Sequence, residues 1–158
     1  MDKAKAIKAL YSLTYGLYVV TSFKDGIMGG ATVVWVTQSS KKPLAVMLGL
    51  MDDSRTGEMI EESKVFAVNI LSPDQTGIVK RFASKMEPNE KFEDVAYKIG
   101  QTGCPLIESA VAFIECKLVH EIKPGSHKIY LGEVVDANIN IEKPPAVYRN
   151  GKIFGVAA

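Results

Sequence analysis

The sequence has very few of the residues that build metal sites. Its 158 residues include only two cysteines and two histidines, and neither Cys104 nor Cys116 belongs to a CxxC motif or lies near a histidine pair. Structural zinc and iron–sulfur sites need such clusters of ligands, so we expect no metal centre. Because the sequence shows neither a membrane-spanning run nor a signal peptide, we expect a cytoplasmic protein. In that reducing compartment we expect the two isolated cysteines to be buried thiols and not a disulfide.

An excess of charge of one sign is also lacking. Nineteen Lys and Arg residues nearly balance 18 Asp and Glu residues, which leaves a formal charge of +1. No apolar run approaches the ~20 residues that span a bilayer. The first ten residues mix Asp, Lys and Ala, unlike the apolar centre of a signal peptide. We expect neither nucleic acid nor a membrane as partner, and we expect any anionic ligand to be held by a local group of residues.

Several catalytic and nucleotide-binding motifs are missing. The sequence contains no GxGxxG and no P-loop lysine, so the Rossmann and P-loop folds are unsupported. No Ser/His/Asp order and no paired carboxylates indicate a hydrolase. What is present is an ordinary globular composition, with 47% hydrophobic and 23% charged residues, at a length typical of one domain spanning residues 1–158.

β-branched and aromatic residues dominate the chain after residue 16, and three segments have helical character. The first three expected strands form a meander over residues 17–22, 31–37 and 44–50. Later strands are expected at residues 65–71, 110–119, 128–137, 146–148 and 152–154, the last two joined by the type I′ turn signal Asn150-Gly151. Helices are expected at residues 2–13, 55–63 and 73–84, and an exposed loop at 85–91. This pattern favours a closed antiparallel barrel with helical caps.

Two segments carry candidate phosphate ligands. Ser54, Arg55 and Thr56 lie at the expected start of a helix, where free N–H groups and the helix dipole favour an anion. The alternative is that Ser54 is only an N-cap, as most helices require one. Lys80 and Arg81, on the next helix, are candidates for counter-charge, or they belong to a solvated face.

Two further segments carry candidate ligand contacts. The run Gly29-Gly30-Ala31-Thr32 has small side chains that allow a flat ligand to approach the backbone; the alternative is a glycine bulge or turn. Gly125-Ser126-His127 places an imidazole at a turn between two strands, where it can donate hydrogen bonds or titrate near neutrality. The alternative is a simply exposed histidine.

The order of these segments resembles the flavin reductase-like family, whose fold is the FMN-binding split barrel, over nearly the whole chain. Each motif is weak by itself, and the resemblance depends on their ordered recurrence. The matching segments are Tyr15–Ser22, Ala31-Thr32 with Val36-Thr37 and Pro43, Ser54-Arg55-Thr56, Phe66–Leu71, Lys91-Phe92, Gly103–Leu106, Ala112–Cys116, Gly125–His127 and Leu131–Val134.

The resemblance implies a mainly β fold with short helices, an antiparallel split β-barrel. It implies that the phosphate of FMN is held by Ser54 and Thr56 with neighbouring basic residues, and that a small-residue strand lies along the isoalloxazine ring. It also implies that His127 lies near the reacting face of the flavin, as a catalytic residue that positions the nicotinamide or the acceptor. The cofactor-binding residues implied are Ala31, Thr32, Val33, Val34, Thr37, Gln38, Ser54, Arg55, Thr56, Lys80 and Arg81.

The resemblance further implies an oxidoreductase that takes electrons from NADH or NADPH and passes them to a flavin, a ferric complex or a protein, and that forms a homodimer. Ser126 stands where the family's motif has an acid, which favours an alternative: an FMN electron carrier of the flavoredoxin type. A non-enzymatic flavin-binding module is a third hypothesis. Tyr15, Trp35 and Phe154 are candidates for a subunit interface, although the core is the more common location of aromatic residues.

Overall fold

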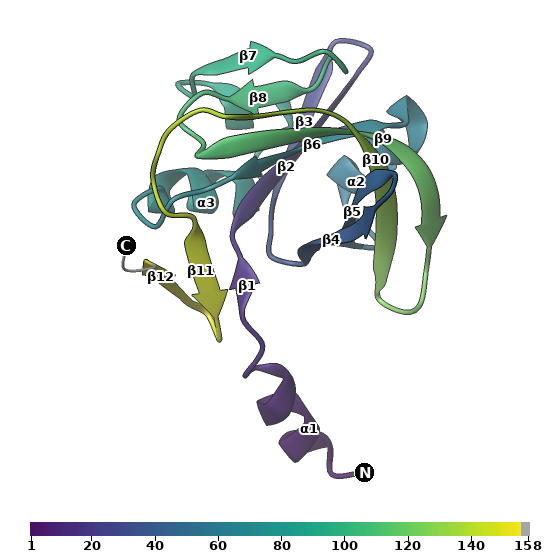
Figure 1. The fold of residues 1–158 in the computed structure, drawn as a ribbon, viewed down its shortest axis with the longest axis vertical. Helices are drawn as coiled ribbons and strands as arrows, with labels where there is room; N and C mark the ends of the chain where they lie inside the picture. Colours follow the sequence, from purple (N-terminus) through teal and green to yellow (C-terminus); the bar gives the residue numbers. More distant parts are fainter. Residues whose placement is uncertain (156–158) are drawn as a thin grey trace.

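The centre of the molecule is an antiparallel sheet of seven strands, seen edge-on in the upper half of Figure 1. The structure is a computed structural model, and it describes residues 1–155. The strands lie in the order β3-β2-β6-β9-β10-β5-β4. Their bounds are β2 (Tyr18–Lys24), β3 (Ile27–Val33), β4 (Val36–Lys41), β5 (Leu44–Met51), β6 (Val65–Ile70), β9 (Ala112–Ile122) and β10 (His127–Ile139).

The sheet curls without closing, because β3 and β4 follow each other in the chain but form its two opposite edges. β3 pairs only with β2, and β4 only with β5, so the expected meander of three strands is wrong. The expected strand over 31–37 is interrupted at Val34 and Trp35, where the Val36 N–H turns back to the Val34 carbonyl. The split barrel is therefore confirmed, and the closed barrel is corrected.

Smaller elements surround this sheet (Figure 1). A three-stranded sheet contains β1 (Tyr15–Gly16), β11 (Ala146–Arg149) and β12 (Lys152–Gly155), and a two-stranded one contains β7 (Tyr97–Ile99) and β8 (Pro105–Ile107). The β11–β12 turn has positive φ at Asn150 (47°) and Gly151 (75°), which confirms the type I′ prediction. The helices are α1 (Lys3–Leu10), α2 (Arg55–Ser63), α3 (Thr76–Ala83) and the 3₁₀ turn η1 (Asn89–Phe92).

The helices differ in how they join the core. α1 projects away from the body beyond β1 and has no buried residue, although its apolar residues have helical spacing. α2 begins as expected at Ser54, whose Oγ accepts the Gly57 N–H at 3.2 Å, and it buries Ile60 completely. α3 buries Phe82. Because α2 and α3 lie against the strands next to the split, their ends are available to a ligand there.

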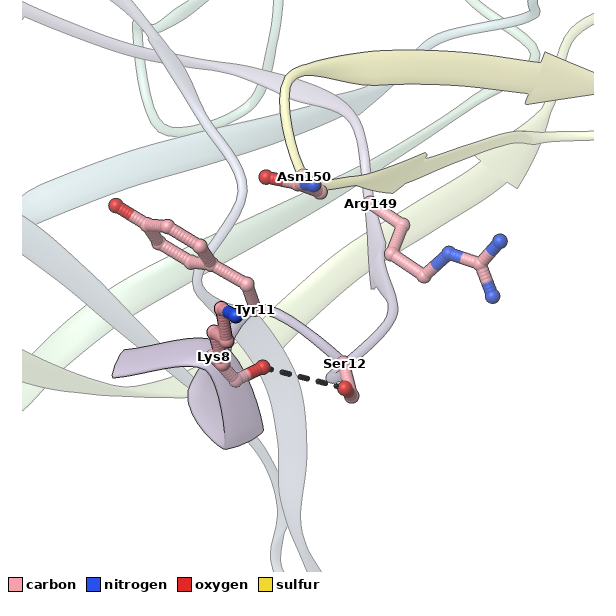
Figure 2. A pocket seen from close by; sticks show the side chains of 5 residues that line it. All are labelled: Lys8, Tyr11, Ser12, Arg149 and Asn150. Atoms are coloured by element: carbon pink, nitrogen blue, oxygen red, sulfur yellow. Dashed lines mark hydrogen bonds between the residues drawn. The ribbon is translucent and has the colours of Figure 1, made fainter. Parts of the chain in front are cut away.

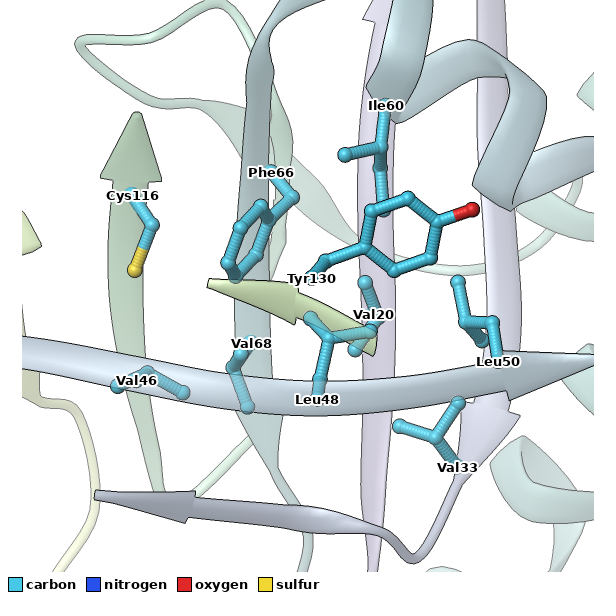
Figure 3. Close-up of a cluster of buried hydrophobic side chains, with 10 residues drawn as sticks. All are labelled: Val20, Val33, Val46, Leu48, Leu50, Ile60, Phe66, Val68, Cys116 and Tyr130. Carbon is cyan, nitrogen blue, oxygen red and sulfur yellow. The ribbon is translucent and has the colours of Figure 1, made fainter. Parts of the chain in front are cut away.

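The main core lies between α2 and the concave face of the sheet. Figure 3 shows Phe66, Tyr130, Leu48 and Ile60 pointing toward one another, and each is at most 1% exposed. Burying a side chain of this size stabilises the fold by about 1.5–3 kcal/mol. The strands that carry the site residues are therefore fixed from behind by dense packing.

Two glycines of β3 serve this packing. A Cβ at Gly29 would lie 2.8 Å from the Met59 sulfur, and one at Gly30 would lie 2.6 Å from the Phe82 ring. The run Gly29-Gly30 thus lets α2 and α3 approach the strand. At Gly29 and Gly30 the small residues serve packing against helices, while Ala31 and Thr32 of the same run line a groove. Within residues 1–155, no helix is long and apolar enough to cross a membrane.

Candidate functional site

A wide groove opens beside β3, at one edge of the open sheet. Its volume is about 1340 Å³, above the ~300–1,000 Å³ that is usual for a pocket holding one small ligand. β3, the bend after it, the start of α2 and the start of β10 all contribute to its walls. The groove brings together eight of the residues predicted for the site, namely Ala31, Thr32, Val33, Val34, Ser54, Arg55, Thr56 and His127.

One end of the groove is suited to an anion. The N-terminus of α2 opens into it, with Ser54 as cap and Thr56 buried in the first turn. Unpaired N–H groups and the positive end of the helix dipole attract a phosphate at such a position. Arg55 lies beside them and pairs with Glu87 at 2.9 Å, with both side chains about two-thirds exposed. An exposed pair of this kind is worth at most about 1 kcal/mol, so the guanidinium is readily released to a ligand.

A lysine without a predicted role lies at the same end. The Lys91 ammonium donates to the Gly30 and Phe82 carbonyls, each at 3.2 Å, and the residue lines the groove. Burial, and secondly the charge of Arg55, lowers the pKa of Lys91. The residue was expected at the end of an exposed loop, but it is half-buried in η1. Its only signal in the sequence was the Lys91-Phe92 motif.

The remaining predicted binding residues lie outside the groove lining. Thr37 and Gln38 are exposed on β4, and the Gln38 amide donates to the Ser40 carbonyl at 3.1 Å. On α3, the Arg81 guanidinium donates to the carbonyls of Lys91 and Glu90 at 2.8 and 3.1 Å. Arg81 therefore fixes η1, and with it Lys91, while Lys80 is exposed.

An aromatic pair forms part of the wall. The rings of Trp35 and His127 are 4.3 Å apart between centroids and inclined at 42°. Gly49 on β5 makes room for the indole, since a Cβ there would lie 3.1 Å from it. Trp35 is 46% exposed and Phe154 39%, and Tyr15 is half-buried, so none of these three aromatic residues belongs to the core.

The loop before His127 is tied to the turn before α2. The Asp52 N–H donates to the Ser126 carbonyl at 3.1 Å, and the Asp52 carboxylate pairs with Lys123. The hydrogen bond from Lys123 lowers the pKa of Asp52. Behind this turn, Glu61 accepts from Lys128 at 2.6 Å and from the Tyr130 hydroxyl at 2.7 Å. Hydrogen bonds and an ion pair thus connect the loop that carries His127 to the turn before α2, the helix whose N-terminus suits an anion.

The chemistry available here is binding and positioning. Burial raises the pKa of Cys104 to about 11 and that of Cys116 to about 12, so neither thiol is an active nucleophile at neutral pH. Among residues 1–155 no three His, Cys, Asp or Glu side chains are grouped to hold a metal ion. An anion-binding end beside an aromatic wall suits a long ligand with a phosphate and a flat ring.

Curated relatives of the chain include reductases. A ferric-chelate reductase (NAD(P)H) of Archaeoglobus fulgidus is 38% identical over 136 residues, covering 84% of this chain and 80% of the relative. A flavin reductase of Pseudomonas putida is 37% identical over 145 residues, covering 90% of this chain and 84% of the relative.

Solved structures agree with the sequence relatives. The flavin reductase PheA2 superimposes with a TM-score of 0.87 at 31% identity, and each chain is covered completely. The flavin reductase HpaC, solved in complex with NADP⁺, gives a TM-score of 0.85 at 32% identity, with 97% of each chain covered. The model of the flavin reductase like domain matches residues 10–157, and the chain therefore belongs to the flavin reductase family.

Proposed function

We propose that this protein is an NAD(P)H-dependent flavin reductase that binds FMN in the groove beside β3 and passes electrons to a flavin, a ferric complex or another protein. One observation carries the proposal: a single groove, larger than one small ligand needs, joins a phosphate-binding helix end to the Trp35–His127 pair. Such a groove has room for a flavin and a nicotinamide nucleotide together. Relatives named as flavin and ferric-chelate reductases support the same reaction.

The residues present fit a flavin mononucleotide. Ser54, Thr56 and the α2 N-terminus would hold the phosphate, with Arg55 and Lys91 supplying counter-charge. The backbone of residues 31–34, with small and apolar side chains, would lie along the ring system. When bound, the flavin supplies the hydride and electron chemistry that no side chain in the groove supplies.

His127 is the residue we place closest to the reaction. Its ring packs on Trp35, and its Nδ1 lies 3.1 Å from the Ser126 hydroxyl. These two contacts orient the imidazole, and its second nitrogen remains available for a hydrogen bond to a carboxamide. In this role His127 positions the nicotinamide and transfers no proton.

Steady-state kinetics test the proposal. Purified protein should consume NADH or NADPH at a rate that saturates with added FMN. His127→Ala should raise KM for the nucleotide several-fold and leave the dissociation constant of FMN unchanged, because the imidazole contacts only the nucleotide. No consumption of either nucleotide by FMN-loaded protein would reject the function, and unchanged kinetics of the variant would reject the role of His127.

An FMN electron carrier is the second candidate. Ser126 stands where the family's motif has an acidic residue, and the groove has an open side. Both features favour the carrier. A carrier should oxidise NAD(P)H slowly while being reduced rapidly by a redox-protein donor. The same FMN-loaded sample separates the two functions when it is offered each donor in turn.

We further propose that the protein is a cytoplasmic homodimer. Four apolar residues, Met47, Val119, Ile122 and Val135, are each at least 36% exposed on the adjacent strands β5, β10 and β9. Apolar side chains gathered on neighbouring strands are typical of a subunit interface. Sedimentation equilibrium should give twice the chain mass of 17.2 kDa, and a monomer would reject the dimer. The two buried free cysteines fit a reducing compartment.

A further inference from the structure

A second, smaller cavity lies where α1 meets the β11–β12 turn. It has a volume of about 270 Å³ and is lined by Lys8, Tyr11 and Ser12 from one segment and by Arg149 and Asn150 from the other. Figure 2 shows Tyr11 and Arg149 on either side of the Asn150 turn, with Lys8 beneath Tyr11. Two cations and an aromatic ring therefore surround one small cavity.

The charges of this cavity are available to a ligand. Within residues 1–155, neither Lys8 nor Arg149 forms a salt bridge, while seven other pairs do. The Arg149 guanidinium lies 5.5 Å from the Phe154 ring centre, a contact that leaves its charge unneutralised. Because the whole chain carries a charge of only +1, this basic pair is a local feature.

The small cavity continues the groove. Tyr11 and Asn150 line both, and Tyr15 and Tyr148 line the groove beside them. An elongated ligand in the groove would thus reach a basic, aromatic end opposite the phosphate end at α2. A phosphorylated adenosine matches that end, because its base stacks on tyrosine and its phosphate pairs with Lys and Arg.

We infer that the cavity between α1 and the β11–β12 turn binds the phosphorylated adenosine end of a dinucleotide, with Tyr11 contacting the base and Lys8 and Arg149 the phosphate. The inference rests on the proposed function and extends it. Three dinucleotides carry this chemistry: NADH, NADPH and FAD each contain an adenosine 5′-phosphate, and NADPH adds a 2′-phosphate. FMN lacks the adenosine altogether.

The double variant Lys8→Ala/Arg149→Ala tests the inference. Both residues are exposed and α1 buries nothing, so the variant should fold normally. Adenosine 2′,5′-bisphosphate is the direct probe, titrated calorimetrically into the wild type and the variant. We expect about a tenfold or larger loss of affinity, since charge-assisted bonds to phosphate are among the stronger ones. Lys3→Ala/Lys152→Ala removes the same charge from the same helix and hairpin, and it should bind like the wild type.

Enzyme kinetics and flavin titration then identify which dinucleotide places its adenosine end in the cavity. A raised KM for NADPH with an unchanged KM for NADH assigns the cavity to the 2′-phosphate, and an equal rise for both assigns it to the adenylate of the nicotinamide nucleotide. Weaker binding of FAD with unchanged binding of FMN assigns it to the flavin adenylate. Equal binding of the bisphosphate by wild type and double variant, or equal losses in the control, overturns the inference. Because the bisphosphate titration requires no turnover, it gives its answer even if the protein proves not to be a reductase.

Discussion

At the residue scale, the phosphate end of the groove depends on a few hydroxyl and N–H groups. Ser54 has two roles there. Its Oγ accepts the Gly57 N–H as the helix cap, and we propose that it also contacts the phosphate. Loss of a serine cap costs about 1 kcal/mol of helix stability. Thr56, in the first turn of α2, is 5% exposed and lines the groove.

The variant Ser54→Ala/Thr56→Ala should therefore weaken binding of FMN. Hydrogen bonds to a charged group are worth about 1.5–3 kcal/mol each, which predicts a rise in the FMN dissociation constant of tenfold or more. Riboflavin has the same ring and no phosphate, and its affinity should not change. Fluorescence titration with both ligands measures the difference. Equal losses for the two flavins would contradict the phosphate role and indicate a disturbed α2.

Prediction from sequence at this scale depended on local signals. A helix start marks Ser54 and Thr56 as candidates, and a rare histidine at a turn marks His127, but only the family resemblance gives these residues a role at a flavin. Lys91 has no role predicted from the sequence and Trp35 only one at a subunit interface, since their places in the groove arise from segments distant in the sequence. Lys91 reaches the Gly30 carbonyl 61 residues away, and Trp35 meets His127 across the split.

At the element scale, the β9–β10 loop and the turn before α2 are tied together through Asp52. These contacts join the element that carries His127 to the helix that we propose binds phosphate. Because the hydrogen bond from Lys123 lowers the pKa of Asp52, the carboxylate keeps its charge down to a pH below the usual range for aspartate.

Asp52→Asn should loosen this tie without touching a ligand. We expect KM for the nicotinamide nucleotide to rise by up to about fivefold, because an exposed ion pair contributes only weakly, and FMN affinity to be retained. The effect should shrink at high salt, which already screens the wild-type pair. Glu62→Gln breaks the comparable Lys24–Glu62 pair away from the groove and serves as the control. A similar KM change in both variants, or a loss of FMN, would refute the coupling.

The element pattern was predicted more completely than the pairing of its strands. Most strands and three helices lie where periodicity and turn residues placed them, including the Asn150-Gly151 hairpin. The meander was wrong because residues 33–36 are an unbroken apolar run, with no turn residue to mark the bend at Val34 and Trp35. The local sequence pattern shows where a strand lies but not which other strand it pairs with. Here β3 and β4, although consecutive in the chain, lie at opposite edges of the sheet.

At the scale of the whole molecule, failure of the sheet to close creates the site. A closed barrel would pair β3 with β4, whereas here β3 is an edge strand that lines the groove. The open edges instead leave backbone and small side chains of β3 facing the N-terminus of α2 and the start of β10. The dense core behind them, around Phe66 and Tyr130, keeps these walls in position when ligands bind.

Anaerobic rapid mixing of the FMN-loaded protein with NADH or NADPH tests the central claim most directly. The visible absorption of the flavin is followed after mixing, so the reaction is observed without any acceptor. If the groove holds both ligands together, the flavin band should bleach promptly, at a rate that saturates with nucleotide concentration. A band that persists with both nucleotides, in protein that retains its FMN, would contradict the assignment as a flavin reductase.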